Sequence, residues 1–93
     1  MQIGIIGAGG MAAYHAKGFT LAGAEVVGIA DPNKPRSEAF AATHAIPATY
    51  RTLKEMKTQH PNLDAVSIVT PNKFHASLTI EALQMGLHVY CEK

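Results

Sequence analysis

The feature that most constrains this chain is a glycine-rich turn between an apolar run and a helical pattern. The turn reads Gly7-Ala8-Gly9-Gly10-Met11-Ala12, a Gly-x-Gly-x-x-Ala pattern, and it follows the apolar segment 2–6. An acid, Asp31, stands 22 residues after Gly9, where a second apolar run ends. A turn of this kind, after a strand, before a helix and with an acid one strand later, predicts a dinucleotide-binding βαβ unit.

Each position of the turn has a physical role in that prediction. Gly7 permits the tight turn, Gly9 lets the backbone approach a pyrophosphate closely, and Ala12 is small enough for the helix to pack on the strand. Gly10 adds backbone freedom, and Met11 lies with it at the helix N-terminus, whose N–H groups and dipole bind phosphate. Two alternatives stay open here: a βα turn that binds no ligand, and a site for S-adenosylmethionine, which lacks a pyrophosphate.

The acid at the end of the second apolar run predicts the choice of cofactor. The Asp31 carboxylate can accept hydrogen bonds from the adenosine ribose hydroxyls and repels a 2′-phosphate, so the sequence favours NAD over NADP. Lys34 and Arg36 follow closely and could soften that preference, or they could be solvated residues of the next helix. NADP therefore stays open as the cofactor.

Apolar β-type runs alternate with helical patterns along the whole chain, which is typical of a parallel sheet with helical crossovers. The expected strands are 2–6, 25–30, 48–50, 65–69 and 87–91, and the expected helices are 10–22, 35–44, 52–60 and 73–85. Right-handed crossovers then give an α/β, doubly wound (Rossmann) sheet with strand order 3-2-1-4-5. Because a six-stranded sheet needs one more strand, we expect residues 1–93 to form one incomplete dinucleotide-binding domain.

Composition and charge exclude several classes of protein. The net charge is +1 without a one-sided basic patch, which argues against nucleic-acid binding. No apolar run approaches the roughly 20 residues of a membrane helix, and no charged segment precedes an apolar one as in a signal peptide. The five histidines lack metal-site spacing, and the single cysteine fits a reducing cytosol. We therefore predict a cytoplasmic protein that binds no metal, membrane or nucleic acid.

Four segments together resemble the glucose–fructose oxidoreductase / inositol dehydrogenase / MocA family over essentially the whole chain. They are GIIGAGGMAAYH (4–15), ADPNKPRSEAFA (30–41), DAVSIVTPNKFH (64–75) and ALQMGLHVYCEK (82–93). The resemblance implies NAD(P)-dependent hydride transfer to or from a sugar, polyol or related substrate, in an enzyme with a second, substrate-binding domain. That domain would supply an acid and a histidine, so we expect the 93 residues alone to turn over no substrate.

The resemblance also implies roles for residues near the last two strands. Lys93 would lie near the nicotinamide and substrate and assist catalysis, with Glu92 in the same motif, while Thr70, Pro71 and Asn72 would line the cofactor cleft. Their places just beyond strand ends support this, because ligands of open α/β sheets bind there. Asn72 could equally cap the helix that follows, and Lys93 taken alone could be a surface charge. For His75 a packing or capping role is favoured over catalysis.

Two further expectations concern assembly and role. The apolar last strand would be an unpaired edge, and the helix before it is predicted to be buried over more than the usual stripe. We therefore expect either self-association, most simply a homo-oligomer, or that the chain is a fragment of a larger molecule. The alternative functions are a non-catalytic dinucleotide-binding module and an inactive truncated fragment.

Overall fold

The computed structural model describes residues 1–9, 12–70 and 72–91. Its sheet has five strands in the order β3-β2-β1-β4-β5, and every pairing is parallel. The strands are β1 (Gln2–Ile6), β2 (Glu25–Ala30), β3 (Thr49–Tyr50), β4 (Ala65–Ile68) and β5 (His88–Cys91). The predicted doubly wound order is therefore confirmed, with the short β3 at one edge and β5 at the other.

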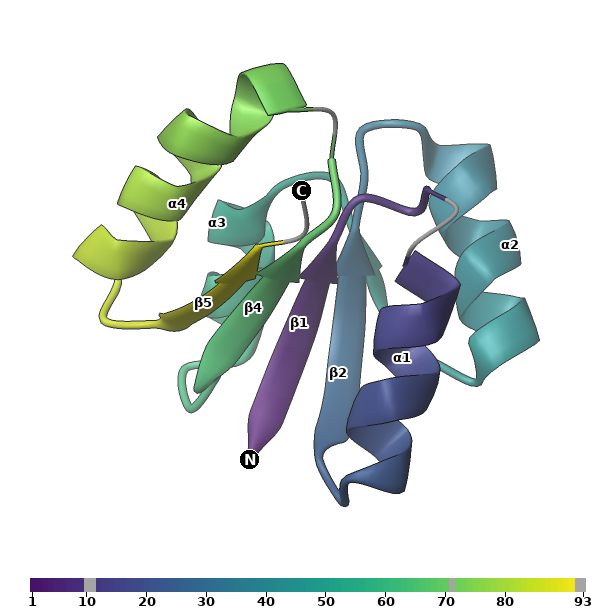
Figure 1. Cartoon of the computed structure of the whole chain (residues 1–93). Coiled ribbons are helices and arrows are strands. Elements are labelled where there is room, and N and C mark those ends of the chain that lie inside the picture. The colour runs from purple at the N-terminus through teal and green to yellow at the C-terminus, as the bar shows by residue number, and fades with distance from the viewer. Residues whose placement is uncertain (10–11, 71, 92–93) are drawn as a thin grey trace.

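Helices cover both faces of this sheet (Figure 1). They are α1 (Ala12–Leu21), α2 (Lys34–His44), α3 (Leu53–Gln59) and α4 (His75–Gln84), with a short 3₁₀ turn, η1 (Asn72–Phe74), before α4. Helices α1 and α2 lie on one face, and α3 and α4 lie on the other. This two-sided cover explains why the strands read as continuous apolar runs instead of alternating patterns.

Two apolar clusters hold the layers together. Consecutive β1 residues point to opposite faces, so Ile5 belongs to the cluster under α1 and α2, whereas Ile6 belongs to the cluster under α3 and α4. The first cluster comprises Ile5, Ala12, Ala16, Ile29, Ala41 and Ile46. The second comprises Ile6, Val27, Ala30, Leu53, Met56, Leu63, Val66, Ile68, Ala82 and Leu87. Ala12 is fully buried, as expected for the small residue that lets α1 approach the sheet.

Local signals in the sequence set the ends of the helices. The Asn33 side chain caps α2, and the Thr52 hydroxyl caps α3 by accepting from the Glu55 N–H at 3.2 Å. The Glu55 carboxylate in turn accepts from the Arg51 N–H at 2.9 Å. Gly23 has φ 84° and follows the last turn of α1, in the left-handed conformation that commonly ends a helix.

The start and the packing of α4 differ from the prediction. The α-helix begins at His75, after the 3₁₀ turn, and its N-cap position is held by Phe74, whereas Asn72 lies at the start of the turn. The expectation of extensive burial was also wrong, because Ile80 and Leu83 are 57% and 58% exposed. Only one side of α4 faces the sheet, where Ala82 is buried, and the apolar residues on its other side have no layer above them.

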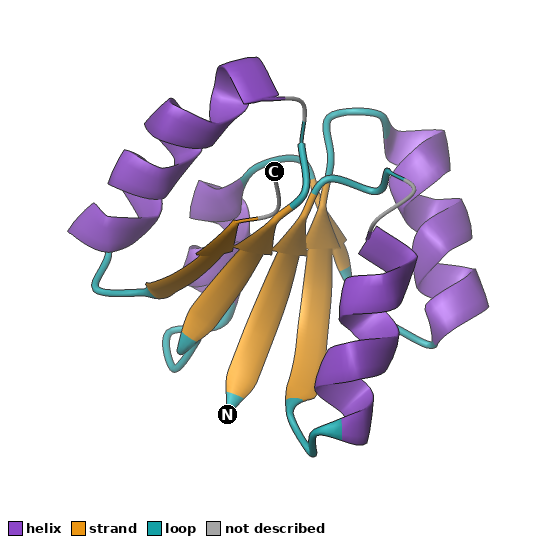
Figure 2. Ribbon diagram, in the orientation of Figure 1, coloured by secondary structure: helices purple, strands orange, loops and turns teal. Residues whose placement is uncertain are grey.

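The parallel strands all end at the same edge of the sheet. Figure 2 shows their arrowheads pointing one way, with the loops that follow β1, β2 and β4 gathered between α2 and α4. These loops carry most of the residues that the sequence marks as functional, so the topology alone brings them together.

Candidate functional site

A cleft of about 700 Å³ opens at the carboxyl edge of the sheet. Five of the residues expected to bind a cofactor line it, and they come from the ends of β1, β2 and β4 and from the first turn of α2. They are Gly7, Gly9, Asp31, Arg36 and Thr70. Segments far apart in the sequence therefore converge on one concave site of a size suited to a small ligand.

Gly7 is a glycine for reasons internal to the fold. Its φ is 97°, in the left-handed region that L-residues rarely adopt. A Cβ there would lie 3.0 Å from Thr70 Cγ2 and 3.1 Å from the Val69 carbonyl carbon. The tight turn predicted for Gly7 is thus confirmed, and the position also holds the β1 and β4 loops in close contact.

Gly9 is different, because no contact among the described residues demands a glycine there. A Cβ at this position would meet only the Val69 carbonyl oxygen among the described residues, at the ordinary contact distance of 3.7 Å. Gly9 nevertheless lines the cleft. Its missing side chain leaves open the space that a ligand needs for close approach to the backbone, as the dinucleotide pattern requires.

Asp31 is the most completely bonded polar side chain of the site. Its Oδ2 accepts from the Ala8 N–H at 2.9 Å, and its Oδ1 accepts from the Asn33 N–H at 2.8 Å. Arg36 donates to Oδ2 from Nε at 3.1 Å and from Nη2 at 2.7 Å. The carboxylate faces the glycine-rich turn, as expected, and at 0% side-chain exposure it is fully covered.

Opposing influences act on the acidity of this carboxylate. Burial raises the pKa of Asp31. The hydrogen bonds from the Ala8 and Asn33 amides, together with the Arg36 guanidinium, lower the pKa by more than burial raises it. The net result is a pKa below the ordinary value of 3.8, so the side chain is ionised at neutral pH. A buried carboxylate kept charged in this way is a strong acceptor for hydroxyl donors that can reach it.

Part of the backbone of the turn is already bonded within the protein. The Gly7 N–H donates to the Ala30 carbonyl at 2.7 Å, and the Ala8 N–H donates to Asp31. A bound diphosphate must therefore be received from Gly9 onward, toward the N-terminus of α1. Gly10 and Met11, which belong to that stretch, lie outside the described residues.

On the opposite side of the cleft, His75 fixes the loop that follows β4. Its Nε2 donates to the Thr70 carbonyl at 2.6 Å, across five residues. This contact supports the structural role favoured for His75. The Thr70 hydroxyl is buried and has no hydrogen-bond partner among the described residues. A buried polar atom in that state can be satisfied by a ligand.

Several lining residues escaped the sequence analysis. Arg51, Thr52 and Leu53 follow β3, so the rule that ligands bind beyond strand ends applies to them as well. Phe74, at the end of η1, and Leu78 and Glu81 of α4 also line the cleft. Their spacing of four and three residues is typical of side chains on one helix face, and this was the signal in the sequence that could have found them.

The remaining expected site residues are Ala12, Asn72, Pro71, Glu92 and Lys93. Ala12 supports the turn from within the core. Asn72 lies in η1, whereas Pro71, Glu92 and Lys93 lie outside the described residues. Within residues 1–9, 12–70 and 72–91 no group of three or more metal-ligating side chains is assembled. In the same part of the chain, no helix has the length and apolar character to cross a membrane.

Sequence comparisons place the chain among oxidoreductases. The model of an oxidoreductase family with an NAD-binding Rossmann fold matches residues 1–93. Inositol 2-dehydrogenase of Corynebacterium glutamicum (strain R) is 35% identical over 95 aligned positions, and the alignment covers 100% of this chain and 28% of that protein. Glucose-6-phosphate 3-dehydrogenase of Bacillus subtilis (strain 168) is 36% identical over 93 aligned positions, which cover 99% of this chain and 25% of that protein.

Solved structures agree with these matches. Scyllo-inositol dehydrogenase from Lactobacillus casei, with bound cofactor NAD(H) and scyllo-inositol, superposes with a TM-score of 0.85 at 26% identity. An NAD-binding oxidoreductase from Klebsiella pneumoniae gives a TM-score of 0.88 at 30% identity. All of this chain is covered in both cases, against 28% and 27% of the other chains. The present chain thus spans little more than a quarter of the proteins it resembles.

Proposed function

This chain belongs to the oxidoreductase family with an NAD-binding Rossmann fold, and from that premise we propose that its cleft binds NAD for hydride transfer to or from a sugar or polyol. The similar proteins act on inositol and on a sugar phosphate, as their names state. Because the chain spans 28% of the inositol dehydrogenase, the activity is proposed for the whole enzyme. The 93 residues alone are expected to bind the cofactor without turning over substrate.

The contrast between two glycines carries this proposal. Gly7 is required by a left-handed φ and by its contact with Thr70, whereas a Cβ on Gly9 would find ordinary space. Packing therefore accounts for the first glycine and leaves the second unexplained. A diphosphate resting on the backbone explains it, since that ligand needs the volume that a Cβ would occupy.

Different residues of the cleft bind different parts of the cofactor. Backbone N–H groups from Gly9 toward α1, including Gly10 and Met11, hold the diphosphate, and Asp31 accepts from the adenosine ribose. Arg36 lies beside that ribose position, and Thr70, Pro71 and Asn72 form the wall nearer the nicotinamide. The ionised Asp31 favours NAD, because it repels the 2′-phosphate of NADP.

The reactive end of the site is assigned to the last two residues. When bound, NAD accepts or supplies the hydride. Lys93, next to Glu92, donates a hydrogen bond to the substrate oxygen and stabilises the charge that develops on it. In the whole enzyme, Lys93→Met is expected to lower kcat by at least about a hundredfold, the loss typical of a charge-stabilising donor. A variant that keeps full kcat would remove Lys93 from the mechanism.

Calorimetric titration with NADH tests the role of Gly9. In Gly9→Ala, the new methyl group should overlap the bound diphosphate at a cost of about 1–3 kcal/mol, which weakens binding roughly tenfold or more. The stability of the free chain should change by less than about 0.5 kcal/mol, since the methyl group fits the free fold. The matched control is Gly18→Ala on the exposed side of α1, where a Cβ meets nothing within 4 Å. Equal NADH binding by the wild type and both variants would contradict the proposal.

The choice of cofactor is tested by titrating NADH and NADPH into the wild type and into Asp31→Ala. We expect the wild type to bind NADH more tightly, and Asp31→Ala to lose most of that difference, because the carboxylate is both the ribose acceptor and the source of the repulsion. Tighter NADPH binding by the wild type would reverse the assignment. Binding of neither by a folded sample would remove the cofactor proposal for this chain.

We also infer a homo-oligomer and a cytoplasmic location. Support for the oligomer comes from β5, which ends the strand order, and from the exposed apolar residues Ile80, Leu83 and Tyr90 near it. Sedimentation velocity of the 93-residue chain should detect a species heavier than one chain. A stable, monodisperse monomer would contradict the inferred homo-oligomer. The location rests on the single cysteine, which suits a reducing compartment.

A further inference from the structure

The Oδ2 atom of Asp31 already receives more donors than its two lone pairs provide, so it has no acceptor capacity left for a ribose. An ionised carboxylate offers about four lone-pair sites. Oδ2 receives the Ala8 N–H and two N–H groups of Arg36, while Oδ1 receives the Asn33 N–H. The side chain is also fully covered, with 0% exposure. A cofactor ribose can therefore bond to Oδ2 of Asp31 only if one of the donors to this atom withdraws.

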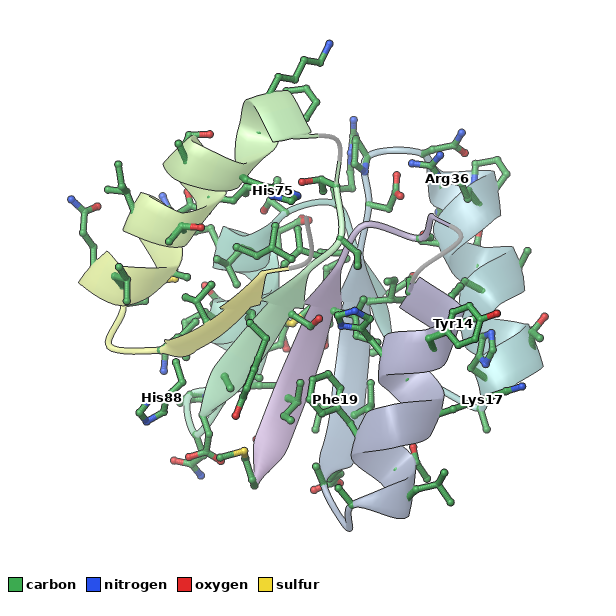
Figure 3. The ribbon with its side chains drawn as sticks, viewed as in Figure 1. Tyr14, Lys17, Phe19, Arg36, His75 and His88 are labelled. Atoms are coloured by element: carbon green, nitrogen blue, oxygen red, sulfur yellow. The ribbon has the colours of Figure 1, made fainter. Side chains whose placement is uncertain are left out.

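Arg36 is the donor that can withdraw. The other two are backbone amides of the β1 and β2 loops, so displacing them would move the main chain. The Arg36 side chain is 53% exposed, although its partner is buried, and it reaches Asp31 from the first turn of α2 (Figure 3). A long side chain that already lies half in water loses little by moving fully into it.

The same contact changes the electrostatics of the site. A lone buried carboxylate repels a 2′-phosphate, but the guanidinium 2.7 Å from Oδ2 cancels much of that charge. When a ligand displaces it, the guanidinium stays tethered a few ångströms away and remains positive at any accessible pH. The ion pair thus hinders hydrogen bonding between Asp31 and the ribose hydroxyls of NAD. It also reduces the electrostatic repulsion of the 2′-phosphate of NADP.

We propose that Arg36 determines cofactor specificity by competing with the adenosine ribose for Asp31, and so narrows the preference for NAD over NADP. This inference rests on the proposed function and adds to it a cost that the bound cofactor must overcome. It also assigns the ion pair to the free state of the site: Arg36 satisfies the buried carboxylate until a ribose replaces it.

The test is calorimetric titration of NADH and NADPH into the 93-residue chain and into Arg36→Met, which keeps an unbranched side chain at this position and removes its charge and its N–H donors. We expect NADH to bind about three- to fivefold more tightly to the variant, the range of one solvent-accessible ion pair. NADPH should bind about tenfold more weakly, since a single charge contact to phosphate is lost. Thermal melts should show a larger stabilisation by NADH in Arg36→Met than in the wild type.

Two further variants make the result decisive. Lys34→Met removes a neighbouring exposed positive charge that makes no described contact with Asp31, and it should change both affinities less than twofold. Arg36→Lys keeps the charge without the two-pronged contact, so its NADH affinity should rise less than in Arg36→Met; it also serves if Arg36→Met fails to fold.

Each outcome has a defined meaning. Weaker or unchanged NADH binding in the Arg36 variants would overturn the competition and make Arg36 a cofactor contact or a bystander. If Lys34→Met and Arg36→Met changed the two dinucleotide affinities equally, the role of Arg36 would be a general effect of positive charge and not competition for Asp31. If the wild type fails to bind NADH while Arg36→Met binds it, the competition is supported in its strongest form. If neither binds either dinucleotide, the proposed function fails, and this inference fails with it.

Discussion

The two sides of the cleft solve the same problem in different ways. The β2–α2 wall, formed by Asp31, Asn33 and Arg36, satisfies its buried carboxylate with four donor contacts and begins its helix with a side-chain cap. The β4–α4 wall, formed by Thr70, Phe74, His75 and Leu78, has a helix without a side-chain cap among the described residues. It also contains the buried, unpartnered Thr70 hydroxyl.

This difference indicates on which wall a bound ligand must replace existing hydrogen bonds and on which wall it can add new ones. On the β2–α2 wall, hydrogen bonds already exist, so a ligand has to exchange one donor for another. On the β4–α4 wall, a polar atom lacks a described partner, so a ligand can add a bond without breaking one. The first wall therefore governs stability and selectivity, and the second is expected to contribute affinity at little structural cost.

Asp31→Ala is expected to have the largest effect on stability of the variants that test the difference between the two walls. It removes a buried acceptor from two backbone amides and from Arg36, and we expect the free energy of unfolding to fall by about 3 kcal/mol. The control is Asp64→Ala. Among the described residues, the exposed Asp64 carboxylate accepts from the Gln2 N–H alone, at the opposite edge of the sheet, so its loss should cost less than about 1 kcal/mol. Urea unfolding measures both, and equal losses would show that the β2–α2 wall has no special stability.

Gly7→Ala probes the contact between the turn and the β4 loop. The variant forces an L-residue to φ 97° and brings its Cβ to within 3.0–3.2 Å of Val69 and Thr70 atoms. We expect a loss of about 2 kcal/mol, made up of backbone strain and overpacking. In Gly23→Ala, φ is 84° but no atom lies within 4 Å of the Cβ, so only about 1 kcal/mol should be lost. Identical chemical denaturation curves for the two variants would rule out the packing component.

His75→Ala removes the side-chain hydrogen bond that links α4 to the loop after β4 in the β4–α4 wall. The hydrogen bond from Nε2 to the Thr70 carbonyl is a single neutral contact, worth about 1 kcal/mol of stability. His75→Gln, which can still donate to that carbonyl, should recover part of the loss. A drop as large as that of Asp31→Ala would mean that the two walls are equally integrated into the fold.

Thr70→Val should have the smallest effect on the free chain. Because the Thr70 hydroxyl has no partner among the described residues, exchanging it for a methyl group should change stability by less than about 0.5 kcal/mol. Thr52→Val, the same substitution on another lining residue, removes a helix cap and should cost about 1 kcal/mol. If Thr70→Val proved as costly as Thr52→Val, the hydroxyl would have a partner within the protein.

Much of the fold could be predicted because its signals are local. Gly23 and Asn33 end or begin helices through contacts within a few residues, and the apolar run of β1 reflects burial on both faces. The glycine-rich turn and Asp31 were predicted to meet, and they do, because both follow neighbouring parallel strands. The exposure of Ile80 and Leu83 was not predictable in this way, since apolar content does not say how many sides of a helix have neighbours.

By itself, the sequence determined the order of the elements, the topology they form and the edge at which function gathers, because periodicity, turn residues and chain direction act over short distances. Only the tertiary structure decided that Arg36 takes the carboxylate expected for a ribose, that α4 lends residues to the cleft, and that Gly7 and Gly9 are glycines for different reasons. These facts depend on distances between side chains and loops brought together by packing, and linear spacing does not encode such distances.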